Sequence, residues 1–260
     1  MYTKSKILLR YIKMIFIVKL AGQRIQIHSV YPELKDFFKD YIVEGEAYDF
    51  SVSWTKEDIL AEQEYSEEKN FPLTYLETLA ALRKISDILP TRQRFLMHGA
   101  SITYNDKAYL FTAISGTGKS THISLWRKHL GEAVQIVNGD KPFLSIGEPD
   151  ATGHRPVHIY GTPWAGKENW QKNRSAQLNG ICFLCRGTTN TIRKIEPVEC
   201  LSLLMKQVYI PANTEAAGCT LDLLDLLVTN VPLYILECDI SEDAVRCSFE
   251  AMTGLKYPNV

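Results

Sequence analysis

The sequence lacks an excess of one charge, an abundance of glycine or proline, and any repetition. Its 29 basic and 30 acidic side chains give a formal net charge of −1, so we expect no general attraction to nucleic acid or to an anionic membrane. A local basic patch remains compatible with that balance. With 15 Gly, 11 Pro and 45% hydrophobic residues, the composition excludes collagen-like, low-complexity and disordered chains. No internal repeat is found, and 260 residues fit one large domain or one domain with an appendage.

Long hydrophobic runs are missing from the N-terminal segment. The longest uncharged run within Met1–Gly22 is Met14–Val18, far short of the ~20 residues that a membrane helix needs. No small-residue cleavage site follows that run. We therefore expect a cytoplasmic protein with no membrane partner and no nucleic-acid partner, in which residues 1–13 are a possible N-terminal extension.

The sequence also lacks a cysteine pattern that binds a metal. Cys182 and Cys185 form one CxxC within an apolar run, where residues three apart on a strand point to opposite faces. No second CxxC completes a zinc site. We interpret the six cysteines as structural thiols in a reducing compartment.

Residues 14–58 predict a small β-rich N-terminal module. Apolar residues alternate with polar ones over Phe16–Ile27, with a turn in the middle, which predicts a hairpin. Pro32–Tyr41 has helical spacing, and Tyr48–Trp54 alternates again.

Residues 59–90 are predicted to form a helical connection. The acidic stretch Glu57–Asn70 indicates a solvated link or helix face rather than a docking tail. Leu73–Leu89 has the apolar spacing of a helix with a buried face, and Pro90 ends it.

Residues 91–260 alternate strands and helices, as an α/β nucleotide-binding domain does. The predicted strands are Phe95–Ile102, Ala108–Ala113, Val134–Val137, Val157–Tyr160, Ile181–Leu184 and Leu233–Glu237. The predicted helices are Thr121–His129, Pro197–Val208, Ala216–Thr229 and Ile240–Met252.

A glycine-rich loop connects the strand Ala108–Ala113 to the next helix. Its sequence SGTGKS matches a phosphate-binding loop in that context, although Ala113 stands where the usual pattern has glycine. Backbone N–H groups and the helix N-terminus favour phosphate oxygens. Lys119 offers a charge to the β- and γ-phosphates, and Ser120 offers a hydroxyl to Mg²⁺. We expect ATP to bind Ser115, Gly116, Thr117, Gly118, Lys119, Ser120 and Thr121; a chance Gly/Ser turn is the alternative.

Three further positions are candidates for chemistry. Asp140 ends the next apolar strand, where a kinase-type fold has a carboxylate for Mg²⁺ or for the acceptor hydroxyl; an ordinary turn aspartate is the alternative. His98 ends a strand just before the hairpin into the loop, and a structural histidine is the alternative. In the irregular segment Tyr160–Trp170, Lys167 and Glu168 are candidates for phosphate, metal or acceptor contacts, or else a surface ion pair.

These motifs resemble those of the HPr kinase/phosphorylase and phosphoenolpyruvate carboxykinase superfamily, and the chain looks like a divergent small member. The loop is similar to the carboxykinase version, and His98-Gly99 matches a His-Gly pair of HPr kinase/phosphorylase. The resemblance covers residues 92–186 well. It implies a P-loop core of the HPr-kinase C-terminal type, with a mixed β-sheet and flanking helices, and a role for His98 near the reacting phosphate.

One departure from that family is expected to affect metal binding. The family's strand after the loop ends in Asp-Asp, the first a general base and the second near the metal; here Asp140 matches the first, and Lys141 stands at the second. A lysine cannot ligate Mg²⁺, so the resemblance implies a metal site made of Ser120, Asp140 and Glu168. The segment from Lys141 onward is similar to small HPr-kinase-like proteins, some of which phosphorylate a serine on a peptide.

The leading hypothesis is an ATP-dependent kinase with Mg²⁺ as cofactor and Asp140, His98 and Lys119 as catalytic residues. Its acceptor is the serine of a protein, peptide or small molecule, and homo-oligomerisation is compatible with it. An ATP-binding sensor or scaffold without turnover is the alternative that Lys141 favours. A carboxykinase-like lyase is a third, although the chain is shorter than such enzymes usually are and no separate Lys/His pair for Mn²⁺ is visible.

Overall fold

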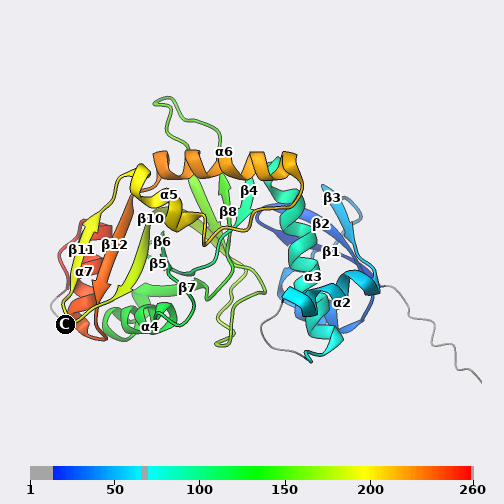
Figure 1. Ribbon diagram of the computed structural model, residues 1–260, viewed down its shortest axis with the longest axis horizontal. Coiled ribbons are helices and arrows are strands. Elements are labelled where there is room, and N and C mark those ends of the chain that lie inside the picture. Colours follow the sequence, from blue (N-terminus) through cyan, green and yellow to red (C-terminus); the bar gives the residue numbers. More distant parts are fainter. Residues whose placement is uncertain (1–13, 66–69, 259–260) are drawn as a thin grey trace, which may run out of the picture. The chain divides into compact units, whose positions relative to one another are not determined.

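The computed structural model describes residues 14–65 and 70–258, and the chain divides into two compact units, residues 1–85 and 86–260 (Figure 1). The expected N-terminal extension, residues 1–13, lies outside the described residues, as does part of the acidic stretch at 66–69.

The N-terminal unit has a three-stranded sheet in the order β1-β2-β3. Its elements are β1 (Met14–Leu20), β2 (Gln23–Ser29), α1 (Glu33–Phe37), the 3₁₀ turn Lys39–Tyr41, β3 (Phe50–Ser53), α2 (Lys56–Tyr65) and the larger part of α3 (Leu73–Ile88). The predicted hairpin is present: β1 and β2 pair antiparallel across a two-residue turn at Ala21 and Gly22, both with positive φ. β3 pairs parallel to β2.

A buried carboxylate ties α3 to this sheet. Glu77 has no exposed surface and accepts hydrogen bonds from the backbone N–H of Val30 (2.5 Å), the backbone N–H of Tyr31 (3.0 Å) and the indole of Trp54 (2.8 Å). Burial raises the pKa of Glu77, and these hydrogen bonds oppose the rise. The predicted helical connection over 59–90 thus contains a helix that packs on the small sheet.

The C-terminal unit is built on a nine-stranded mixed sheet in the order β4-β8-β9-β10-β6-β5-β7, with β12 beside β10 and β11 beside β12. The strands are β4 (Arg94–Leu96), β5 (Ala100–Tyr104), β6 (Lys107–Thr112), β7 (Val134–Asn138), β8 (Phe143–Ile146), β9 (Val157–Tyr160), β10 (Ser175–Arg186), β11 (Thr191–Lys194) and β12 (Leu233–Cys238). The helices are α4 (Lys119–Leu130), α5 (Pro197–Leu204), α6 (Thr214–Asn230) and α7 (Glu242–Thr253), with 3₁₀ turns at Leu89–Arg92 and Gly131–Ala133. β10 runs parallel to β6 and β12, whereas its pairing with β9 is antiparallel. The predicted α/β class, with a mixed sheet and flanking helices, is confirmed.

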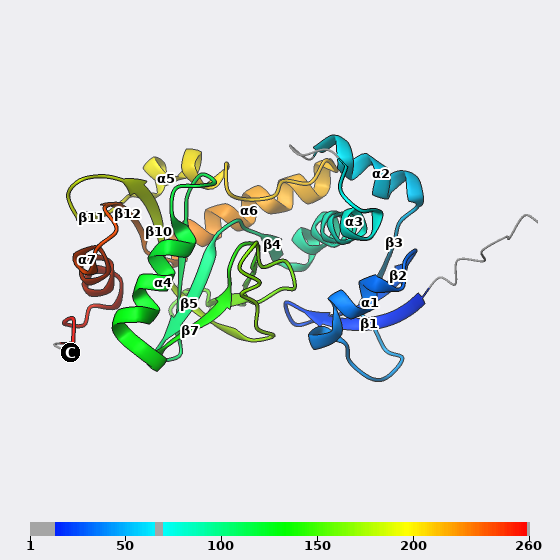
Figure 2. The ribbon, with the colours of Figure 1, turned by 90° about the horizontal axis from the view of Figure 1, so that it is seen from below.

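Helices cover both faces of this sheet (Figures 1 and 2). One apolar cluster joins the sheet to α5 and α6 through residues such as Leu204 and Leu224. The other joins the opposite face to α4 and α7 through Trp126 and Phe249. None of the helices in the described parts of the chain combines the length and apolar character needed to cross a lipid bilayer.

The cysteines behave as the strand alternation predicts. Cys182 on β10 is fully buried, whereas Cys185 on the same strand is exposed, so the two CxxC thiols diverge. All six cysteines are free thiols.

Several strands of the structure differ from the predicted ones. The predicted strand Phe95–Ile102 is two strands, β4 and β5, because the N–H groups of His98 and Gly99 bond to Gln207 O (2.6 Å) and Asp140 O (2.8 Å) instead of continuing one ladder. The short strands β8 and β11 were not predicted, and β10 begins at Ser175, earlier than expected.

Candidate functional site

The glycine-rich loop lies between β6 and α4. Gly116 and Gly118 have φ of 78° and 122°, and an added Cβ would meet nothing within 4 Å at either position. The glycines are therefore required by the backbone conformation, not by crowding. Gly118 caps α4, whose start has no side-chain cap, so its first N–H groups are available to an anion.

Lys119 is 9% exposed, and its ammonium donates to the carbonyl of Ala113 (3.1 Å). Among the described residues this is its one hydrogen-bond acceptor, so two N–H groups remain for a ligand. Burial lowers the pKa of Lys119, with the charge of Asp140 opposing and that of Lys141 adding to the shift. The departure from the usual loop pattern, Ala113, has its methyl group in the apolar cluster under α4 and keeps its carbonyl for the lysine.

Asp140 lies between two positively polarised groups. Its Oδ1 is 3.1 Å from His98 Nε2, and its Oδ2 is 2.6 Å from Lys141 Nζ. Burial alone would raise the pKa of Asp140, but the hydrogen bond from His98 and the charge and hydrogen bond of Lys141 outweigh it and hold the pKa well below the usual range. Asp140 is thus a carboxylate at neutral pH.

Asn138, fully buried at the end of β7, shapes the turn that carries Asp140. Its Oδ1 accepts from the N–H groups of Asp140 (2.9 Å) and Lys141 (2.7 Å), while its Nδ2 donates to Thr162 O (2.9 Å). Gly139 permits the close approach of the following loop, because an added Cβ would lie 2.6 Å from Ala165 O. The Asp140 turn and the loop after β9 are therefore joined by a hydrogen bond and packed closely against each other.

Gln207 contacts the other ring nitrogen of His98, Nδ1. Its Oε1 lies 3.0 Å from His98 Nδ1 and 3.2 Å from Thr112 Oγ1, whose hydroxyl is also 2.7 Å from His98 O. If the amide oxygen faces Nδ1, that nitrogen carries a proton and the ring is doubly protonated; if the amide nitrogen faces it, the proton is on Nε2 alone. In both arrangements His98 presents an Nε2–H to Asp140.

These groups line a polar cavity of about 550 Å³. Of the predicted site residues, the cavity brings together His98, Ser115, Gly116, Gly118, Lys119, Ser120, Thr121, Asp140 and Glu168, together with Lys141 and Lys167. Thr117 is the exception, because its hydroxyl turns back to Ile114 O (2.8 Å). Lys167 and Glu168 are exposed at the rim and do not form an ion pair with each other.

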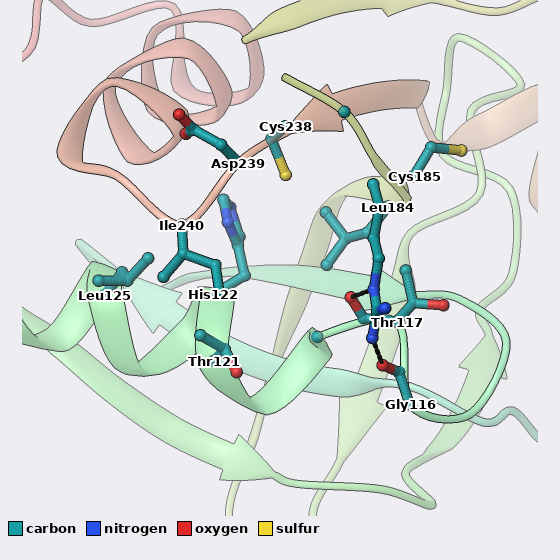
Figure 3. A pocket seen from close by; sticks show the side chains of 13 residues that line it. Gly116, Thr117, Thr121, His122, Leu125, Leu184, Cys185, Cys238, Asp239 and Ile240 are labelled. Carbon is teal, nitrogen blue, oxygen red and sulfur yellow. Dashed lines mark hydrogen bonds between the residues drawn. The ribbon is translucent and has the colours of Figure 1, made fainter. Parts of the chain in front are cut away.

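A second, apolar cavity of about 590 Å³ adjoins the other side of the loop (Figure 3). It shares Gly116, Gly118 and Thr121 with the polar cavity. Figure 3 shows Leu125 and Ile240 at the end away from Gly116. Its other lining residues are Thr117, His122, Leu184, Cys185, Arg186, Gly187, Cys238 and Asp239.

Arg186, at the end of β10, braces the loop from this second cavity. Its guanidinium donates to the carbonyls of Gly116 (2.5 Å) and Thr117 (3.4 Å). The carbonyl of Gly116 faces Arg186, and the N–H of Thr117 in the same peptide unit donates to Ile114 O (3.2 Å). Sequence reasoning assigned no role to Arg186, Gln207 or Asn138; only Asn138 had a local signal, as the first residue of an N-G-D turn.

The residues present fit a magnesium ion that arrives with phosphates. Within the described ranges no three His, Cys, Asp or Glu side chains converge as a metal site. Ser120, Asp140 and Glu168 line one cavity, however, and supply a hydroxyl and two carboxylates. Mg²⁺ commonly takes one or two carboxylates, with phosphate oxygens and water completing its shell.

No family model matches the chain, and no curated protein matches it. Among solved structures, the HPr(Ser) kinase/phosphatase from Coxiella burnetii is similar over 61% of this chain and 93% of that chain, with 12% identity and a TM-score of 0.28. This is a distant structural resemblance, and the assignment of a function therefore depends on the site itself.

Proposed function

We propose that the C-terminal unit is an ATP-dependent kinase that transfers the γ-phosphate to a hydroxyl group, with a serine of a protein, peptide or small molecule as acceptor. One observation supports this most: the loop cation Lys119 and the ionised Asp140 line the same cavity. A phosphate group and an acceptor hydroxyl would thus meet between them.

The adjoining apolar cavity suits the nucleoside of ATP. Leu125, Leu184 and Ile240 offer apolar surface, and the cavity opens onto the glycine-rich loop where the phosphates would bind. Ile240 is 77% exposed, so a base lying against it would remove apolar surface from water.

In the proposed step, the acceptor oxygen forms a bond to the γ-phosphorus as the bond from that phosphorus to the β–γ bridging oxygen breaks. The bridging oxygen leaves on ADP with the electron pair, and the hydroxyl proton passes to Asp140 and then to solvent. Lys119 stabilises negative charge on the phosphates with its two remaining N–H groups. Positioning and electrostatics contribute most of the acceleration in such reactions. Mg²⁺, held by Ser120, Asp140 and Glu168, would neutralise phosphate charge.

The low pKa of Asp140 makes it a weak base that orients the hydroxyl and accepts its proton late. Asp140 becomes a stronger base if it loses one of its two partners. Lys141 is the partner more easily displaced, because His98 is also held by Gln207 (3.0 Å). We infer that bound phosphate draws the Lys141 ammonium away from Oδ2.

The resting contacts of Asp140 also favour a second candidate, an ATP-binding sensor without turnover. If the pair between Asp140 and Lys141 (2.6 Å) persisted with ATP bound, Asp140 would stay too weak a base to accept the proton of an acceptor hydroxyl. The two candidates differ in whether any acceptor becomes phosphorylated.

Transfer of labelled γ-phosphate from ATP with Mg²⁺ tests the proposal. The acceptors are free serine, a serine-containing peptide and HPr, and Lys119→Ala is the inactive control. Label in an acceptor with the wild type alone supports the kinase and defines its substrate class. Tight ATP binding with no labelled acceptor favours the sensor.

A further inference from the structure

A third cavity of about 940 Å³ lies beside β7. We name it the basic groove, defined by Arg127, Glu132, Gln135, Trp170, Lys172 and Arg174. Its outer wall is the end of the loop after β9, which runs along β7: Lys172 N donates to Val137 O (3.2 Å), and Gln171 forms a bridge to Asn138.

The basic groove and the polar cavity are lined by consecutive parts of one loop. One loop forms a wall of both, because Gly166–Glu168 line the polar cavity and Asn169 and Trp170 line the groove. Trp170 lies against the Asp140 turn, since a Cβ added to Gly139 would be 3.3 Å from the Trp170 Cβ. The loop therefore places the groove next to the turn that carries Asp140.

The charges of the groove are unbalanced. It contains three cations, Arg127, Lys172 and Arg174, and one carboxylate, Glu132. Among the described residues, neither Arg127 nor Lys172 forms an ion pair.

Some surface cations elsewhere in the chain are neutralised, as in the pairs Lys84–Asp58 (2.9 Å) and Arg193–Glu199 (2.8 Å). The guanidinium of Arg174 in the groove instead donates to the neutral amide oxygen of Gln135. The groove thus keeps positive charge that this chain does not compensate.

We propose that the basic groove binds an acidic segment of a polypeptide acceptor, next to the serine that enters the polar cavity. This inference rests on the proposed function and narrows its acceptor to a polypeptide. Cations from α4 and from the loop after β9 flank the groove, so aspartate or glutamate side chains would meet positive charge on two sides. Its volume lies in the upper part of the range of about 300–1,000 Å³ that ligand sites occupy.

Binding without nucleotide tests this inference separately from the kinase activity. Fluorescence anisotropy would compare three labelled peptides of equal length, with alanine in place of serine and with flanking Glu, Gln or Lys residues. The wild type should bind the Glu peptide at least about tenfold more tightly than the Gln peptide at low salt, and the difference should shrink as salt rises. Equal affinity for the Glu and Gln peptides would overturn the inference.

Charge reversal provides the matched controls. Arg127→Glu with Lys172→Glu should abolish the preference for the Glu peptide and favour the Lys peptide. Lys128→Glu, an exposed change on the same helix outside the groove, should leave the preference intact. The inference would also be overturned if Lys128→Glu reduced the preference for the Glu peptide equally, or if a single-stranded RNA of similar length bound more tightly than the Glu peptide. If the Glu peptide binds the groove but the corresponding peptides with serine are never phosphorylated, the inference about the groove holds and the kinase proposal is wrong.

Discussion

The two cavities that flank the glycine-rich loop differ in how they hold charge. In the apolar cavity, polar groups are bonded within the protein: the carboxylate of Asp239 accepts from Asn190 (2.9 Å) and Ser241 (2.5 Å). In the polar cavity, Lys119 keeps two N–H groups for a ligand, and Asp140 is bonded to His98 and Lys141, which line the same cavity. Under the proposed function, the apolar cavity would bind the nucleoside, and the polar cavity would bind the phosphates and carry out transfer.

The histidines show the same contrast. His122, in the apolar cavity, is 3% exposed and bonds to Ser248 Oγ (3.0 Å), and burial lowers its pKa to about 4. His98, in the polar cavity, is bonded between Gln207 and Asp140. One histidine is a neutral part of the core, and the other belongs to a charged network. Substitutions on the two sides should therefore affect different measurements.

The largest effect is expected from Lys119→Ala. Losing two charge-assisted hydrogen bonds to phosphate should weaken ATP binding by about a hundredfold or more. Isothermal titration with ATP would measure this, with Lys128→Ala as a control on the same helix. Unchanged affinity in Lys119→Ala would show that the loop does not bind phosphate.

His122→Gln should make stability less sensitive to acid. Because the folded pKa of about 4 is below the value of 6.5 in an unfolded chain, the unfolded state binds the extra proton, and stability is lost as pH falls from 6.5 toward 4. The shift corresponds to about 3 kcal/mol. Urea unfolding at pH 7 and pH 4.5 should show a smaller difference in the variant than in the wild type. An identical pH dependence would contradict the assignment of His122 as a buried neutral group.

Gln207→Met should slow phosphate transfer about tenfold while leaving ATP affinity unchanged, because His98 loses the partner that orients its ring. ¹⁵N NMR of the histidine should show an altered protonation of Nδ1. Gln207→Glu offers only an acceptor and should restore the orientation if Nδ1 carries a proton, so it also distinguishes the two arrangements of the Gln207 amide. An unchanged rate of phosphate transfer in Gln207→Met would show that the orientation of His98 by Gln207 does not contribute to the reaction.

Ile240→Ser should weaken ATP binding about fivefold, since about 1 kcal/mol of apolar contact with the base is lost. Binding of inorganic triphosphate should not change. Leu221→Ser, at an exposed apolar position on α6, is the matched control. Equal loss for ATP and triphosphate would argue against a nucleoside in the apolar cavity.

The smallest effect is expected from Ala113→Gly, which restores the usual loop pattern. ATP affinity should change by less than about twofold, because the carbonyl that binds Lys119 is kept. A large gain in affinity would show that the natural loop is impaired.

Local patterns in the sequence predicted the parts of the site that are continuous in the chain. The loop before α4 and the strand ending at Asp140 each carry their own signal, an apolar strand followed by turn residues. The α/β class followed from the order of such segments. These features depend on residues that are neighbours in sequence.

Contacts between distant residues could not be predicted in this way. His98 and Gln207 are separated by 109 positions, and Arg186 is 70 positions from Gly116. Nothing near Gln207 marks it as part of a site, because its role depends on where α5 ends. The break between β4 and β5 has the same origin, since the N–H of His98 bonds to Gln207 O (2.6 Å).

The assignment of Asp140 to transfer, and of Lys119 to phosphate binding, is tested most directly by measuring ATP affinity and γ-phosphate transfer together in Asp140→Asn. We expect an affinity within about threefold of the wild type and transfer slower by about a thousandfold. A loss of ATP affinity as large as that of Lys119→Ala would contradict the role assigned to Asp140.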